Sequence, residues 1–123
     1  MKEELIMKKI TKFAKDVYKA LGDGYNETVY EEALAVEMRN AKMDYDIELN
    51  TEIMYKGEKV GIHRLDFIIE RKLVVELKAT GSISKGNISQ IKSYLRTLGL
   101  KKGLLINFPT SGAKAPQIEV ISA

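Results

Sequence analysis

The sequence predicts a mixed α/β layer fold in a single domain, with elements in the order α-α-β-β-β-α-β-β. Apolar residues recur at helical spacing between residues 3 and 40, which indicates two amphipathic helices. Three strand-like apolar runs follow between residues 46 and 79, and one further helical pattern separates them from two short strands. We expect residues 1–123 to form one domain, with a central mixed sheet of about five strands flanked by helices.

The two N-terminal helices are predicted at Glu3–Leu21 and at about Glu27–Asn40. In the first, apolar residues alternate with lysines at a spacing of three or four, so one face is buried and the other is basic. Gly22-Asp23-Gly24 ends it, and Asn26 is a suitable N-cap for the second. Glu27 falls in the first turn of that helix, where interaction with the helix dipole by itself explains an acidic residue.

The remaining elements are short and bounded by turn residues. A polar, glycine-bounded loop at residues 80–86 precedes the third helix, and Gly99 ends that helix. The fourth strand has a continuous rather than alternating apolar run, which is typical of a buried strand. The predicted elements are strands Asp46–Tyr55, Lys59–Glu70 and Leu73–Ala79, a helix from about Asn87 to Leu98, and strands Gly103–Phe108 and Gln117–Ile121.

The hairpin Leu65–Lys78 carries charges where buried strands normally have none. If an odd number of residues closes the turn, Asp66 lies opposite Glu76, Arg64 lies opposite Lys78, and the other face is wholly apolar. An even-length turn would scatter the charges over both faces, so we expect the odd arrangement. Two opposed carboxylates repel each other, and a divalent cation between them removes that penalty.

Carboxylates are the hard oxygen ligands that Mg²⁺ or Mn²⁺ takes, and a nearby lysine can hold a water or stabilise developing phosphate charge. The pattern of Asp66, Glu76 and Lys78 therefore suits metal-assisted phosphodiester hydrolysis. A structural ion-pair cluster of the same side chains with Arg64 on an exposed face is the alternative, and the hairpin alone does not separate the two.

Composition restricts the function classes. A net charge of +3 and a pI near 9.0 suit a polyanionic partner. No apolar stretch is long enough for a membrane span, and the start lacks the apolar core of a signal peptide. There is no Cys, which excludes disulfides and thiolate metal sites. We expect a cytoplasmic protein without membrane contact, small enough that a homodimer or a protein partner would help to bury its surface.

Several short motifs occur in a characteristic order. The segment Gly24-Tyr25-Asn26-Glu27-Thr28-Val29-Tyr30 matches Gly-x-x-Glu-x-x-Tyr in full. The further motifs are Tyr55-Lys56-Gly57, Leu65-Asp66-Phe67, Val75-Glu76-Leu77-Lys78-Ala79, Gln90 to Tyr94 as Gln-x-x-x-Tyr, and Leu104-Leu105-Ile106-Asn107-Phe108. From about Leu21 to Ile121 the chain resembles the GxxExxY family of the PD-(D/E)xK nuclease superfamily, similar to RecB-like nuclease domains. The resemblance implies a restriction-endonuclease-like core.

The resemblance also implies roles for individual residues. Asp66 and Glu76 would be the principal ligands of Mg²⁺, with Mn²⁺ as a substitute, and the backbone carbonyl of Leu77 would complete the site. Lys78 would be the catalytic lysine. Glu27 would be the additional acid near the metal, which replaces the helix-dipole interpretation of that residue.

The third helix would contribute further groups. Gln90 and Tyr94, four apart on one helix face, would flank the site as in RecB-like nucleases. Arg64, Lys85 and Lys92 are candidate phosphate contacts, because they fall near the site in the expected arrangement.

The sequence departs from the family pattern at two points. Leu65 stands where the superfamily name has Pro, and no His lies near the first acidic motif. The single His, His63, is expected on the strand face opposite Asp66, as a packed or surface residue. Tyr30 is expected to pack, and Asn107 to make structural hydrogen bonds.

These observations predict a Mg²⁺-dependent deoxyribonuclease. A four-way-junction resolvase-like endonuclease is the second interpretation, since size and charge fit, although no basic, glycine-rich segment precedes Asp66. The third is a non-catalytic nucleic-acid-binding or assembly module that retains the nuclease fold. Structure-selective cutting would indicate the resolvase, and failure to bind Mg²⁺ or Mn²⁺ would indicate the module.

Overall fold

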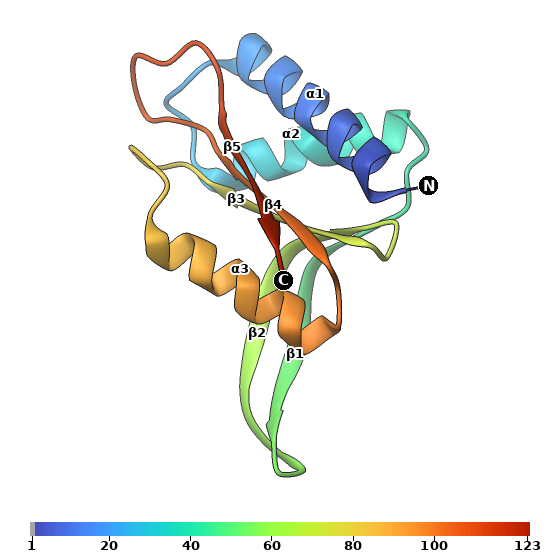
Figure 1. The fold of residues 1–123 in the computed structure, drawn as a ribbon. Helices are drawn as coiled ribbons and strands as arrows, with labels where there is room; N and C mark the ends of the chain where they lie inside the picture. Colours follow the sequence, from blue (N-terminus) through green and yellow to red (C-terminus); the bar gives the residue numbers. More distant parts are fainter. Residues whose placement is uncertain (1) are drawn as a thin grey trace.

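The structure is a computed structural model that describes residues 2–123 (Figure 1). Within that range the element order is the predicted one. The elements are α1 (Glu3–Leu21), α2 (Glu27–Asn40), β1 (Tyr45–Tyr55), β2 (Glu58–Ile69), β3 (Leu73–Lys78), α3 (Lys85–Leu98), β4 (Lys102–Asn107) and β5 (Gln117–Ser122).

The five strands form one sheet in the order β1-β2-β3-β4-β5. β1, β2 and β3 pair antiparallel in sequence, β3 and β4 are parallel, and β5 returns antiparallel to β4. Parallel neighbours need a crossover connection, which α3 supplies between β3 and β4. The predicted mixed sheet is therefore confirmed.

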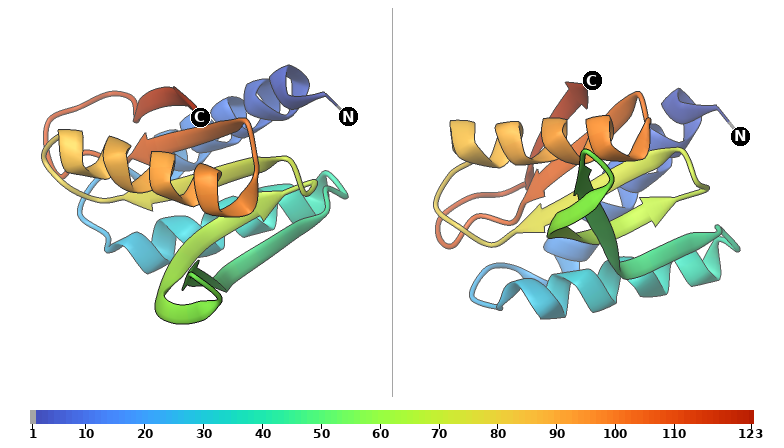
Figure 2. Two further views of the ribbon diagram at one scale, coloured as in Figure 1. Left: turned by 60° about the horizontal axis from the view of Figure 1, so that its bottom comes forward. Right: turned by 90° about the horizontal axis from the view of Figure 1, so that it is seen from below.

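Helices cover both faces of the sheet, so the molecule has three layers (Figure 2). α1 and α2 pack over one face in a core with Phe67, Val75 and Leu77 of the central strands. α3 packs over the other face, where Ile91 and Leu95 belong to a second apolar cluster. None of the helices within residues 2–123 combines the length and the apolar character that a bilayer crossing requires.

Helix starts depend on side-chain caps. Asn26 accepts a hydrogen bond from the amide of Val29, as expected of the N-cap of α2. α3 begins at Lys85, two residues before the predicted Asn87. Ser84 caps it, and the Asn87 side chain accepts in return from the Ser84 amide, which makes a capping box. The sequence pattern does not predict this start, because Gly86 lies in the first turn and glycine is unfavourable inside a helix.

The β2–β3 hairpin has the predicted odd register. Ile69 pairs with Leu73, Ile68 with Val74 and Phe67 with Val75, and residues 70–72 close the turn. Glu70 and Arg71 both adopt left-handed backbone conformations, with φ of 53° and 57°, which reverses the chain in this short loop.

Leu65 corrects one detail of the face assignment. The alternation predicts it on the same apolar face as Phe67, yet it packs in the cluster on the α3 side with Val74 and Ile91. The ladder between β2 and β3 ends at the Phe67–Val75 pair, so beyond it β2 follows β1 alone and no longer keeps the orientation of β3. The expected pairing of Arg64 with Lys78 lies outside that ladder.

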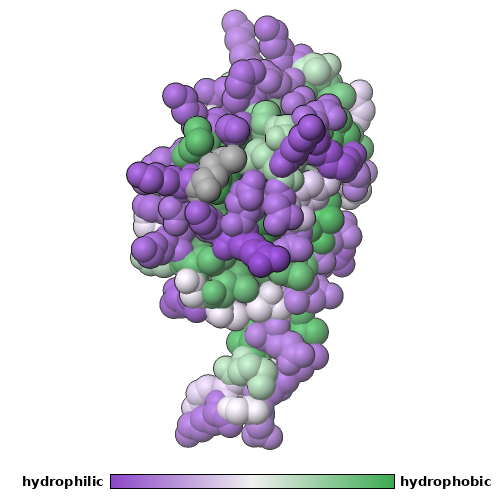
Figure 3. Space-filling view, turned by 90° about the vertical axis from the view of Figure 1, so that its right-hand side faces the viewer, coloured by the Kyte–Doolittle hydropathy of each residue, from purple (hydrophilic) through white to green (hydrophobic). Residues whose placement is uncertain are grey.

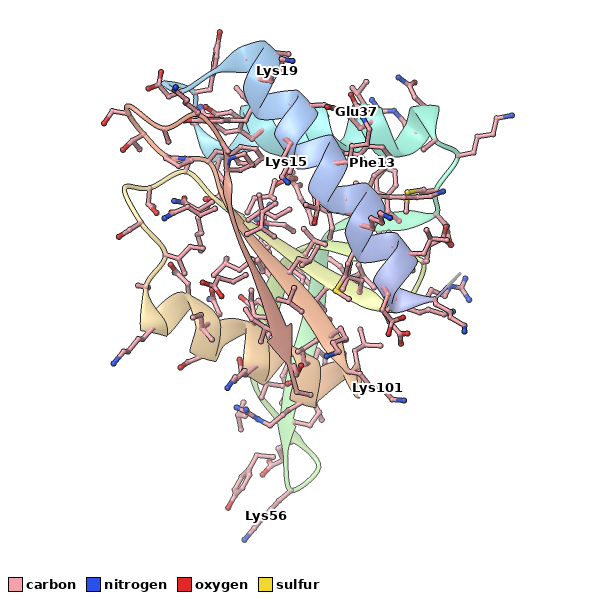
Figure 4. All side chains as sticks on the ribbon, turned by 45° about the horizontal axis from the view of Figure 1, so that its top comes forward. Phe13, Lys15, Lys19, Glu37, Lys56 and Lys101 are labelled. Carbon is pink, nitrogen blue, oxygen red and sulfur yellow. The ribbon has the colours of Figure 1, made fainter. Side chains whose placement is uncertain are left out.

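Beyond the body of the domain, β1 and β2 continue together as a two-stranded arm, seen projecting in Figures 1 and 3. Figure 4 places Lys56 at its tip, in the turn between the strands. Met54, Tyr55, Val60 and Ile62 of the arm are all exposed. Asp66 lies in β2 at the base of the arm, so the two strands that form the arm also supply residues of the candidate site.

Candidate active site

A cleft of about 300 Å³ opens between α2, α3 and the strands at the base of the arm. Its lining is dominated by charged side chains, five of them carboxylic acids. The lining residues are Glu27, Thr28, Glu31, Glu48, Arg64, Asp66, Glu76, Lys78, Gln90 and Tyr94. The six residues singled out in the sequence as catalytic, together with Arg64, thus meet in one cavity.

Asp66 and Glu76 face each other where the β2–β3 ladder ends. The amide of Asp66 donates to Glu76 Oε1 at 2.9 Å, and the amide of Leu77 donates to Asp66 Oδ2 at 2.8 Å. Each carboxylate therefore replaces a backbone carbonyl as the partner of an amide on the other strand. These two hydrogen bonds hold the acids beside each other, and they take the place of the backbone hydrogen bonds that β2 and β3 no longer make here.

Lys78 is the last residue of β3 and is positioned by its own backbone. Its carbonyl accepts from the amide of Phe108 at 2.8 Å. Two residues after Lys78, the chain is held at Thr80 by the buried side chain of Asn107. That side chain accepts from the Thr80 amide and donates to the Thr80 carbonyl, each at 2.9 Å. Asn107 is thus a structural hydrogen-bonder, as expected, and it ties down the chain that leaves the site.

Helix α2 brings two acids to the cleft, where the sequence interpretation named one. Glu27 lies in the first turn, and Glu31 lies one turn further on the same face. Glu31 is 5% exposed, and its Oε1 has no hydrogen-bond partner among the described residues. The signal that could have identified it is the spacing of four from Glu27.

Glu48 of β1 also lines the cleft and was not predicted. It has a left-handed φ of 52° inside a strand, between the Ile47–Phe67 and Leu49–Leu65 pairs. Its Oε2 lies 3.4 Å from Arg64 Nη2 in an ion pair whose side chains are 49% and 69% exposed. An exposed pair of this kind contributes little to stability.

Gln90 and Tyr94 lie on the cleft side of α3, as the spacing of four implies. Tyr94 is 3% exposed, and its hydroxyl donates to the Arg64 carbonyl at 3.4 Å. The ring of His63 packs on Tyr94 with centroids 4.4 Å apart. His63 is not among the residues that line the cleft, so it is a packed residue, as the sequence interpretation expected.

Lys85 and Lys92 differ from Arg64. Both are exposed on α3, and neither lines the cleft. Tyr30 packs as expected: its ring stacks on Phe108 with centroids 4.3 Å apart, and its hydroxyl donates to the Gly22 carbonyl at 2.7 Å. That bond closes the loop ahead of α2 and so positions Glu27.

The cleft is electrostatically crowded. Burial, together with the nearby Asp66 carboxylate, raises the pKa of Glu76 to about 8. Burial, together with the nearby Asp66 and Glu48 carboxylates, raises the pKa of Glu31 to about 7. Burial also raises the pKa of Asp66 and of Glu27, while Lys78 opposes the rise in both. The site therefore favours whatever positive charge can enter it.

The donor set fits a divalent cation. It consists of carboxylate oxygens, the hard ligands of Mg²⁺ and Mn²⁺, with one buried oxygen of Glu31 unsatisfied. Within residues 2–123, no group of three or more His, Cys, Asp or Glu side chains is arranged so that it could hold a metal ion. Asp66 and Glu76 each use one carboxylate oxygen on an amide, and Mg²⁺ commonly binds through one or two carboxylates with water completing its shell.

Comparison with known proteins gives one family and a fold. The family model described as PD-(D/E)XK nuclease superfamily matches residues 4–120. A comparison with curated protein sequences found no match. The crystal structure of SSO0001 has a TM-score of 0.56 and 21% identity over 77% of this chain and 48% of its own. This chain therefore spans about half the length of that protein.

A second solved structure covers more of the chain. It is the alkaline exonuclease LHK-Exo from Laribacter hongkongensis, with a TM-score of 0.52 and 10% identity over 98% of this chain and 82% of its own. At these identities the likeness concerns the fold, which is restriction-endonuclease-like: a mixed five-stranded sheet flanked by helices. With a family match that spans nearly all of its residues, the chain belongs to the PD-(D/E)XK nuclease superfamily.

Proposed function

We propose that this protein is a metal-dependent DNA nuclease of the GxxExxY type, which hydrolyses phosphodiester bonds in the acidic cleft. One observation carries the proposal. Asp66 and Glu76 are held side by side at the end of a strand ladder, in the same cleft as Lys78 and the α2 acid Glu27. A structural ion-pair cluster does not need this excess of buried acid, which is costly without a cation.

In this proposal Asp66, Glu76, Glu27 and the Leu77 carbonyl hold Mg²⁺, with Mn²⁺ as a substitute. The ion, when bound, supplies an activated water and neutralises charge on the phosphate. Lys78 donates to the attacking water or to a phosphate oxygen, as a cation that shares the cleft with both acids.

The α3 side chains position the nucleic acid. Gln90 is an exposed amide beside the acids and can donate to a phosphate oxygen. The Tyr94 hydroxyl donates a hydrogen bond to the Arg64 carbonyl, and the Arg64 guanidinium forms an ion pair with Glu48. Lys85 and Lys92, both exposed on α3, extend the contact surface along the DNA.

The test is cleavage of linear, single-stranded and branched DNA by the purified wild type and by Glu76→Ala. We expect cleavage by wild type in Mg²⁺ or Mn²⁺, none in EDTA, and a loss of at least about 100-fold in the variant. Equal cleavage by both proteins would indicate a contaminating nuclease and would overturn the assignment. Internally labelled and end-labelled strands distinguish endonucleolytic from exonucleolytic cutting.

A matched control is Glu32→Ala. Glu32 follows Glu31 on α2 but is exposed and does not line the cleft, so this variant loses an acid without touching the site. Its activity should stay within about two-fold of wild type, as expected of a surface substitution. Exclusive cutting of four-way junctions would convert the proposal to a resolvase. Binding of DNA without cutting would convert it to a non-catalytic module.

A further inference from the structure

The two-stranded arm, residues 50–64, has no role in the catalytic proposal. β3 pairs with β2 only at Phe67, Ile68 and Ile69, so along the arm β2 has β1 as its one neighbour in the sheet. No helix accompanies the tip of the arm (Figure 1). A hairpin of two strands is only marginally stable in water, so an arm without a packing layer is expected to gain contacts from a partner.

One face of the arm continues the wall of the cleft. Arg64 lines the cleft, and Ile62 lies on the same face of β2, two residues further out. Their partners on β1 are Asn50 and Glu52, and all four side chains are exposed. A long ligand that occupies the cleft and extends past Arg64 therefore meets this face.

The tip of the arm is a tight turn with an unusual residue in it. Tyr55 pairs with Glu58, and the two residues between them, Lys56 and Gly57, have φ of 49° and 80°. A two-residue turn with two positive φ angles favours Asn or Asp at the first position and Gly at the second. Gly57 meets that requirement, but a lysine is unfavourable in the left-handed region. The turn itself therefore does not explain Lys56.

The charge of the arm differs from that of the cleft. Between residues 50 and 64, Lys56, Lys59 and Arg64 outnumber Glu52 and Glu58, whereas five acids line the cleft against two basic side chains. Lys56 and Lys59 are exposed, and among residues 2–123 neither forms an ion pair. The tip thus presents two cations that are available to a polyanion.

The arm also exposes apolar side chains. Met54, Tyr55, Val60 and Ile62 are each more than half exposed, and a group of exposed apolar residues marks a binding surface. The major groove of B-DNA admits a two-stranded β-ribbon, in which lysines reach phosphates and apolar groups contact thymine methyls. An apolar protein surface would match these four residues but not the two cations at the tip. The combination therefore favours DNA.

We propose that the arm lies in the major groove of duplex DNA beside the cleft, with Lys56 and Lys59 on phosphates distant from the one that is cut. This inference rests on the proposed function, and it makes the substrate a duplex that extends past the cleavage position. From Asp66 to Glu58 the strand spans about 26 Å at about 3.3 Å per residue, which corresponds to about eight phosphates along one DNA strand.

The test compares the double variant Lys56→Ala, Lys59→Ala with its parent, both carrying Lys78→Met so that cleavage is slow. Fluorescence anisotropy in Mg²⁺ measures the affinity for a duplex of about 30 base pairs and for one of its strands alone, and the salt dependence of both. We expect duplex affinity to fall about 10-fold and the salt slope by about two. Single-strand affinity should change less than about two-fold, because a single strand has no groove.

A sharper variant separates binding from folding. Lys56→Asn places a favoured residue in the turn, so its melting temperature should equal or exceed that of the parent, yet its duplex affinity should fall about three-fold. With Lys78 intact, the same change should raise KM for duplex cleavage and leave kcat alone. The matched control is Lys15→Ala, Lys19→Ala, which removes two exposed lysines from α1, away from the arm in Figure 4. It should stay within about two-fold of its parent.

The outcomes separate this inference from the proposed function. Unchanged duplex affinity in the arm variants, alongside normal cleavage, overturns the role of the arm and leaves the nuclease in place. Equal losses for duplex and single strand overturn the placement in a groove. A dimer that Met54→Thr with Ile62→Thr dissociates, with duplex affinity unaffected by the lysine changes, assigns the arm to a second copy of the chain and also overturns the inference. Neither binding nor cleavage of DNA by the wild type overturns both proposals.

Discussion

Asp66 and Glu76 exchange hydrogen bonds across two strands: Glu76 Oε1 accepts from the Asp66 amide, and Asp66 Oδ2 accepts from the amide that follows Glu76, at Leu77. Each acid therefore uses one oxygen to close the gap where β2 and β3 separate. The arrangement makes strand geometry and acid geometry interdependent, so that changes in protonation alter both stability and the site.

The metal-free protein should lose stability as pH rises from about 5 to 8. The pKa of Glu76 is about 8 in the folded state against an ordinary 4.5, and that of Glu31 is about 7. Over this range the folded state retains protons that the unfolded chain has released, so the free energy of unfolding falls with pH. Thermal unfolding in EDTA at several pH values measures this loss of stability, and Glu76→Gln should show a shallower dependence of stability on pH.

Mg²⁺ should reverse that loss at pH 8, because it binds the ionised acids of the folded state only. A melting temperature in EDTA that stays constant or rises between pH 5 and 8 would contradict the raised pKa values. Addition of Mg²⁺ without a rise in melting temperature would count against a metal site in the cleft.

Lys78→Met should reduce cleavage by about 100-fold to 1,000-fold, the usual effect of removing one group that stabilises transition-state charge. Because Lys78 lowers the pKa of Asp66, Glu76 and Glu27, its loss should also move the residual activity to higher pH. The measurement is the pH profile of cleavage. Lys101→Met, at the exposed position labelled in Figure 4, is the control and should change neither quantity.

Asn107→Ala should destabilise the protein by about 2–4 kcal/mol, because it removes the several hydrogen bonds that the fully buried Asn107 side chain makes. The side chain bonds the amide, hydroxyl and carbonyl of Thr80 and also the Gln117 side chain. Chemical denaturation measures the change. Gln117→Ala removes only one of these bonds and should cost less than about 1 kcal/mol; equal effects would show that Thr80 is not held through Asn107.

Gly103→Ala should destabilise the protein by about 1–3 kcal/mol through overpacking. A Cβ at this position would lie 2.8 Å from the Ile91 side chain and 3.3 Å from the Val74 carbonyl oxygen, so α3 would have to move off β4. Since Gln90 and Tyr94 stand on α3, DNA affinity should fall as well. Combining the change with Ile91→Leu, which lacks the Cγ2 methyl that the added Cβ would meet, should recover part of the stability, and a neutral Gly103→Ala would contradict the close approach.

Local patterns predict much of the fold. The odd hairpin register follows from which face is apolar. The same residue pattern is enough to place Asp66 beside Glu76, where two hydrogen bonds join the strands. The start of α3 escapes such patterns because Gly86 resembles a loop residue, whereas the capping box of Ser84 and Asn87 outweighs its helix propensity. Strand alternation puts Leu65 on the wrong face because it assumes that β2 stays paired with both neighbouring strands, whereas its pairing with β3 ends at Phe67 and Val75.

The sequence by itself determined the order of elements, the sheet-forming hairpin and the acids Glu27, Asp66 and Glu76 with Lys78, because periodicity, strand alternation and short motifs are local properties. Only the tertiary structure decided that Glu31 and Glu48 join them. Those two come from a helix and a strand whose relative position depends on packing across the sheet, and neither residue belongs to a motif. Their burial and backbone conformation arise from that packing, which spacing along the chain does not encode.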